Sequence, residues 1–91
     1  MTPTVAATKR RELINAMDYA GEQWAQACKP HKIEMGLVSE EFRKSPEYKR
    51  LSEEFYTAKD KLAVFMKNHQ GKEYAEAFKS ETIEHFKQKR Q

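Results

Sequence analysis

The sequence predicts an all-α fold, a small helical bundle built on an antiparallel pair of long helices with a third helix at the C-terminus. Three observations lead to this prediction. The 91 residues include only 3 glycines and 3 prolines, apolar residues recur at steps of three and four, and the prolines stand near the ends of the periodic segments. A chain of this length forms one domain, so residues 1–91 are predicted to be a single helical domain.

The first helix is predicted near residues 4–29. Steps of four and three residues mark one apolar face, on Leu13, Met17, Ala20, Trp24 and Ala27. Small residues beside this face, among them Gly21, allow a second helix to approach closely. A start near Pro3 uses proline at the first helical position, whereas a later start would place three consecutive cations against the positive end of the helix dipole.

Residues 30–45 form an apolar connector. Ile33, Met35 and Leu37 alternate with Glu34 and Gly36, and residues 39–42 have the pattern of a single capped helical turn. The connector either folds over one end of the helix pair or stays available to a partner. The sequence leaves both alternatives open.

The second helix, near residues 46–69, has the clearest signal. Ser45 is a typical N-cap, Pro46 suits the first helical position, and Gly71 is a natural residue just after the helix. An unbroken stripe at heptad spacing lies between them, on Tyr48, Leu51, Phe55, Ala58, Leu62, Phe65 and His69.

The third helix is predicted near residues 72–88 and is expected to fold back over the other two, with a break near Ser80 left open. Its stripe is wider and less regular than the others. Together the three helices predict a core made of Leu13, Met17, Ala20, Trp24, Tyr48, Leu51, Phe55, Leu62, Phe65 and Phe78.

The sequence offers no set of residues for catalysis, a cofactor or a metal. Cys28 and His31 have a plausible ligand spacing, but a structural zinc site needs four ligands and the chain supplies no second pair. The carboxylates alternate with Lys and Arg on helix faces, as solvated side chains do. With so few glycines, a phosphate-binding loop is hard to build. We therefore expect a protein that is not an enzyme and has no cofactor.

The expected location is the cytoplasm. A single cysteine cannot form an internal disulfide, which suits a reducing compartment. No apolar run approaches the ~18 residues of a membrane span, and no apolar block follows the first cations as in a secretory signal. The sequence therefore predicts no membrane association.

Balanced charge and surplus apolar residues favour a protein–protein interaction module, such as a small adaptor, inhibitor or regulator of a larger protein. Proteins of this size and charge are common among those encoded by phages and bacteria. Aromatic residues and methionine are enriched at the centres of interfaces. The predicted contact set is Ile33, Met35, Leu37, Val38 and Phe42, with Tyr19 or Tyr56 beside it. The competing interpretation is that the connector only covers the chain's own core.

The alternative function is nucleic-acid binding, because the net charge is +3 and the sequence pI is about 9.0. It would use two short basic clusters, Lys9, Arg10 and Arg11 with Lys87, Lys89 and Arg90. Acidic residues are interleaved with the basic ones throughout, however, whereas phosphate binding relies on concentrated cations. Nucleic acid is therefore the less favoured partner.

Self-association is also predicted. The helix stripes are long relative to the residues available to cover them, and exposed apolar surface of that size usually marks an interface. A symmetric homodimer is the commonest arrangement, although the sequence does not distinguish it from a complex with another protein.

Overall fold

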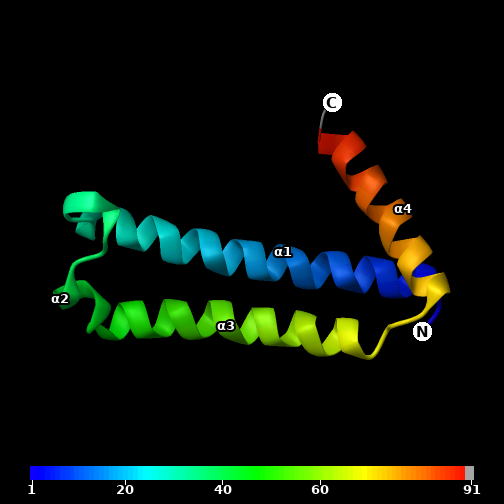
Figure 1. Cartoon of the computed structure of the whole chain (residues 1–91), viewed down its shortest axis with the longest axis horizontal. Helices are drawn as coiled ribbons and strands as arrows, with labels where there is room; N and C mark the ends of the chain where they lie inside the picture. The colour runs from blue at the N-terminus through cyan, green and yellow to red at the C-terminus, as the bar shows by residue number, and fades with distance from the viewer. Residues whose placement is uncertain (90–91) are drawn as a thin grey trace.

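The computed structural model describes residues 1–89 and confirms the all-α class (Figure 1). Its three long helices are α1 (Pro3–Cys28), α3 (Pro46–Lys67) and α4 (Lys72–Lys89). The connector contains two 3₁₀ turns, Lys29–His31 and Glu34–Gly36, and the short helix α2 (Glu40–Arg43). No helix in the described part of the chain is long and apolar enough to cross a membrane.

The starts of α1 and α3 follow from local capping chemistry. Thr2 precedes Pro3, and its hydroxyl accepts a hydrogen bond from the backbone N–H of Val5 at 3.2 Å. In the same way, the Ser45 hydroxyl accepts from the backbone N–H of Tyr48 at 3.2 Å, with Pro46 at the first helical position. Each cap satisfies one of the backbone donors that a helix leaves unpaired at its N-terminus.

The helices α1 and α3 lie side by side and antiparallel, as predicted (Figure 1). Every predicted core residue is buried or half-buried. The Trp24 ring lies 5.5 Å from Tyr48 and 5.7 Å from Phe55, measured between ring centroids. A Cβ atom added to Gly21 would lie 3.2 Å from the Phe55 ring. The absence of a side chain at position 21 therefore allows α3 to pack closely against α1.

The position of α4 differs from the prediction. It does not fold back over both helices but packs against the N-terminal part of α1 and then projects away from the pair (Figure 1). Phe78 is buried with Ala6 and Ala7, whose small side chains let its ring approach the α1 backbone. Ile83 and Phe86, on the projecting half, stay exposed.

The boundary between α3 and α4 also corrects the prediction. α3 ends at Lys67, and Asn68 caps it in the right-handed region of backbone space. Gly71 does not end this helix. Its carbonyl accepts the first hydrogen bond of α4, from the backbone N–H of Ala75 at 2.9 Å. His69 follows α3 with its ring stacked on Phe65 at 4.0 Å between centroids, and α4 has no break near Ser80.

Candidate protein-binding site at the connector tip

The connector folds into a tight loop at one end of the helix pair (Figure 1). The backbone N–H of Ile33 donates to the carbonyl of Leu37 at 2.7 Å, and that of Ser39 donates to His31 at 2.8 Å. Lys32 and Val38 form an isolated antiparallel bridge between these two bonds. We call residues 33–37 the connector tip. Its two sides are held together by backbone hydrogen bonds, which order the loop.

The backbone at the apex is in an unusual conformation. Met35 has φ 65° and Gly36 has φ 73°, both in the left-handed region. Glycine adopts this region readily, but a residue with a side chain pays about 1–2 kcal/mol for it. Local strain of this kind concentrates at functional sites. Methionine at this apex therefore lowers the local stability of the loop, and the fold alone does not require a methionine there.

The tip exposes three large apolar side chains within five residues. Met35 is 95% exposed, Leu37 62% and Ile33 57%. Single exposed apolar side chains are ordinary on protein surfaces, but a contiguous group is a recognised mark of an interaction site. The tip therefore presents three apolar side chains together on a backbone loop that is already ordered.

Two of the predicted contact residues belong to the base of the loop instead. Val38 is half-buried beside the bridge to Lys32. Phe42 is buried, because the helical turn capped by Ser39 directs its ring inward. The Phe42 ring stacks on His31 at 3.9 Å and lies 5.8 Å from Tyr48, between centroids. Phe42 thus packs beneath the tip, and its role as a partner contact stays a prediction.

Tyr19 and Tyr56 are exposed but lie on the helices rather than at the tip. Tyr19 is nine residues before the end of α1, about 13 Å along the helix axis at ~1.5 Å per residue. The Tyr56 ring packs edge-on against Trp24, with 5.9 Å between centroids. Neither tyrosine joins Ile33, Met35 and Leu37 in one group.

The basic residues proposed for nucleic acid are partly occupied within the chain. Arg11 Nε lies 3.0 Å from both carboxylate oxygens of Glu81 on α4. The Arg10 guanidinium donates to the Thr82 hydroxyl at 3.3 Å and lies 5.3 Å from the centre of the Phe78 ring. These two arginines hold α4 against α1, which the sequence did not reveal.

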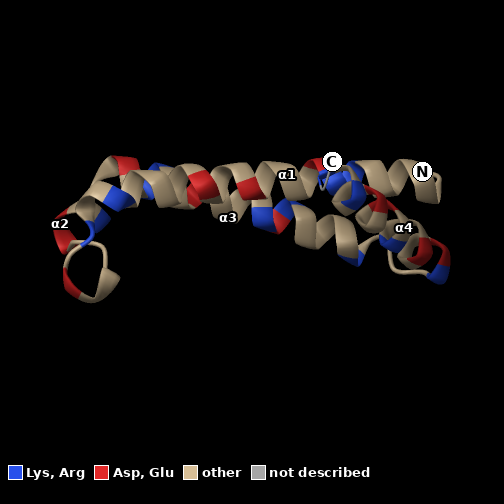
Figure 2. Cartoon of the chain, turned by 90° about the horizontal axis from the view of Figure 1, so that it is seen from above, with Lys and Arg blue, Asp and Glu red and all other residues tan. Residues whose placement is uncertain are grey.

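The remaining basic residues of the predicted clusters that the structure describes lie on α1 and at the end of α4. Lys9 lies 3.8 Å from Glu12 on the same helix, Lys87 and Lys89 occupy the last turn of α4, and Arg90 lies outside the described residues. Figure 2 shows positive and negative residues interspersed along α1 and α3. The arrangement lacks the concentration of cations that phosphate binding uses.

The helix-joining role of Arg11 gives a direct prediction. Its side chain and that of Glu81 are only 16% and 21% exposed, so their hydrogen-bonded ion pair is partly shielded from water. We expect Arg11→Ala to lower the free energy of unfolding by about 2 kcal/mol. Urea titration followed by circular dichroism measures this change.

The exposed pair Arg50–Glu54 is the matched control, with 3.5 Å between its charged atoms. Arg50→Ala should change the free energy of unfolding by less than about 0.5 kcal/mol, as is usual for surface ion pairs. Equal effects of the two substitutions would contradict a structural role for Arg11.

The residues that a metal or a reactive thiol would need can be located in the described chain. Within residues 1–89, no group of three or more His, Cys, Asp or Glu side chains is arranged to hold a metal ion. Cys28 is buried and free. The indole N–H of Trp24 is buried and has no hydrogen-bond partner, but aromatic rings surround it.

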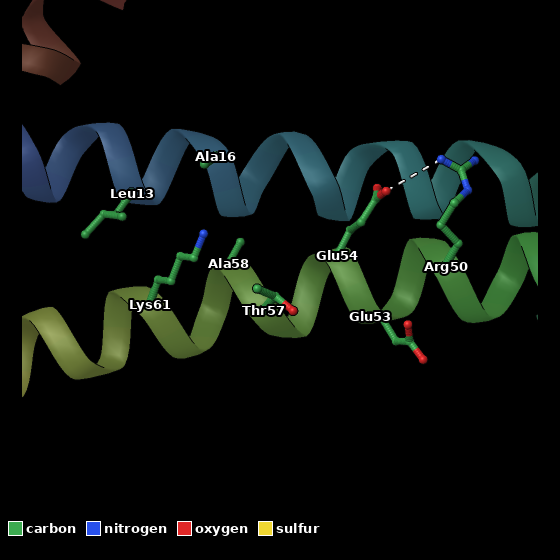
Figure 3. A pocket seen from close by; sticks show the side chains of 8 residues that line it. All are labelled: Leu13, Ala16, Arg50, Glu53, Glu54, Thr57, Ala58 and Lys61. Carbon is green, nitrogen blue, oxygen red and sulfur yellow. Dashed lines mark ion pairs between the residues drawn. The ribbon is translucent and has the colours of Figure 1, made fainter.

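A shallow hollow of about 460 Å³ lies between α1 and α3 (Figure 3). Leu13 and Ala16 line it from α1, and residues between Arg50 and Lys61 line it from α3. Its charged side chains project at the rim, and Arg50 is tied to Glu54. The hollow is open and its floor is apolar, which suits a packing surface better than a small-molecule site.

Comparison with known proteins gave no match, since no family model, curated protein or solved structure is significantly similar to the chain.

Proposed function

We propose that the chain is a non-enzymatic protein-binding module, a small adaptor, inhibitor or regulator that acts in the cytoplasm and inserts its connector tip into an apolar pocket of a larger protein. The observation that carries this proposal is Met35, an almost fully exposed methionine in a left-handed backbone conformation. Selection for stability alone would favour glycine or asparagine there.

The construction of the tip favours binding in three ways. Its backbone hydrogen bonds order the loop before binding, which reduces the entropy lost on association. Methionine is flexible and polarisable, so its side chain adapts to an irregular apolar pocket. The exposed Ile33 and Leu37 flank it and would be desolvated together with it. Apolar side chains that are fully desolvated at the centre of an interface supply most of its binding energy.

The substitution Met35→Asn tests the proposal because it separates binding from folding. Asparagine adopts left-handed conformations more readily than methionine, so the free energy of unfolding should stay unchanged or rise by up to about 1 kcal/mol. The apolar anchor is removed at the same time. We expect the wild type to capture a protein from nuclease-treated cell lysate at high salt, and Met35→Asn to lose it.

The matched control is Ile83→Gln, which removes an exposed apolar side chain from α4 and should leave the captured protein unchanged. Equal capture by wild type and Met35→Asn would contradict the proposal. So would recovery of nucleic acid alone, lost as salt rises, because that behaviour indicates phosphate binding.

A further inference from the structure

The chain exposes more surface than a compact protein of its mass. Its accessible surface is 7036 Å², whereas a compact monomer of 10.7 kDa exposes about 5,500 Å². The excess is therefore about 1,500 Å². The radius of gyration is 16.7 Å, compared with about 12 Å for a compact domain of this length. One pair of long helices with α4 at one end leaves two broad helix faces without a covering element.

One of these faces is hollowed between α1 and α3 and onward along α3. The hollow of Figure 3 adjoins a second hollow on the α3 surface alone, lined by Thr57, Asp60, Lys61 and Val64, and the two share Thr57 and Lys61. We call them together the α1/α3 groove. Its α3 wall runs from Arg50 to Val64, roughly 21 Å along the helix at ~1.5 Å per residue. Its floor of Leu13, Ala16 and Ala58 is apolar and mostly small, so another helix can approach closely.

Two residues of opposite charge on the α3 wall are equally far from Thr57 in sequence. Glu53 lies four residues before Thr57 and Lys61 lies four residues after it. If a second α3 helix runs antiparallel across the groove, with a two-fold axis at Thr57, each Glu53 faces Lys61 of the partner subunit. The symmetry forms this opposite-charge pair twice. Glu54, which would approach Asp60 of the partner subunit, already has its charge balanced by Arg50 at 3.5 Å.

From these observations we infer that the α1/α3 groove binds a second copy of this chain, giving a two-fold symmetric dimer whose α3 helices cross antiparallel at Thr57. A standard interface buries about 800 Å² of each partner, which is less than the roughly 1,500 Å² by which the whole chain exceeds a compact monomer. A two-fold interface uses the same patch on both copies and must be self-complementary. The Glu53 and Lys61 positions meet that requirement.

The dimer would give the proposed binding module two tips. Because the axis passes near the middle of α3, the two connector tips would lie at opposite ends of the assembly. Such a dimer can bridge two partner molecules, or two sites on one partner, with an avidity that exceeds the affinity of one tip. This consequence rests on the proposed function, but the dimer itself does not.

Charge reversal tests the predicted pairing. In Lys61→Glu or Glu53→Lys alone, both opposite-charge pairs become like-charge pairs, so each variant should dimerise at least roughly tenfold more weakly than the wild type. In a heterodimer of the two variants, Glu53 of the Lys61→Glu chain faces Lys61 of the Glu53→Lys chain. The glutamate introduced at position 61 faces the lysine introduced at position 53, so both pairs again join opposite charges. The mixture should form a heterodimer with an affinity close to that of the wild type.

Sedimentation equilibrium over micromolar concentrations measures these affinities. The control is Lys49→Glu, which makes the same charge change on α3 outside the groove and should leave dimerisation unchanged. A wild-type species of 10.7 kDa at all concentrations would overturn the inference, as would a failure of the mixed variants to recover. Either result leaves the Met35→Asn test intact, so failure of the dimer is distinguishable from failure of the proposed function.

Discussion

Replacing Phe78 with alanine is expected to release α4 from α1. Phe78 is the one large side chain in the buried cluster with Ala6 and Ala7, and the Arg10 guanidinium covers its ring. Emptying a buried phenylalanine site costs about 3–5 kcal/mol. That is a large part of the roughly 5–14 kcal/mol expected for a domain of this length. The first effect should be local unfolding of α4.

Hydrogen exchange resolved by residue measures this effect. Amide protection should fall across residues 72–89 in Phe78→Ala and persist in the α1/α3 pair. Phe86→Ala is the matched control, because Phe86 is on the same helix but exposed, and its loss should cost less than about 0.5 kcal/mol. If Phe86→Ala lowers the amide protection of α4 as strongly as Phe78→Ala does, the described packing of α4 is wrong.

The second large effect is expected where α3 packs on α1 near the connector. Leu51 is 6% exposed and lies on the stripe that faces α1, so Leu51→Ala removes apolar contacts and leaves a cavity. We expect the free energy of unfolding to fall by about 2–5 kcal/mol, measured by urea titration. Leu37→Ala makes the same chemical change at the exposed tip and should cost less than about 0.5 kcal/mol. Equal costs would show that the heptad register is misassigned.

The α1/α3 pair could be predicted from sequence because its signals are local and agree with each other. Ser45 and Pro46 specify where α3 begins, and the steps of three and four specify which face is buried. The α1 stripe also contains a signal for the position of α4. The same steps continue from Leu13 back to Arg10 and Ala6, which are the residues that α4 contacts.

The direction of α4 could not be predicted, because it depends on contacts between distant residues. The Arg11–Glu81 pair joins positions 70 residues apart, and nothing near either residue in sequence indicates it. The apolar residues of α4 also divide between two faces. Phe78 faces α1, whereas Ile83 and Phe86 do not, so periodicity alone could not indicate how far α4 stays in contact.

The candidate site was predictable in composition but not in geometry. Alternation of Ile33, Met35 and Leu37 identified the exposed side chains of the tip. The sequence does not show, however, that the turn after Ser39 directs the Phe42 ring inward onto His31. The left-handed conformation of Met35 was also unpredictable, since methionine has no preference for it.

Photo-crosslinking from position 35 shows directly whether the connector tip contacts a protein partner. A photoreactive amino acid is placed at Met35 in one version of the full chain and at the exposed Lys59 of α3 in another, and both are irradiated in cells. We expect one discrete protein adduct from position 35 that is absent from position 59. The absence of any adduct from position 35, or the same adducts from both positions, would contradict it.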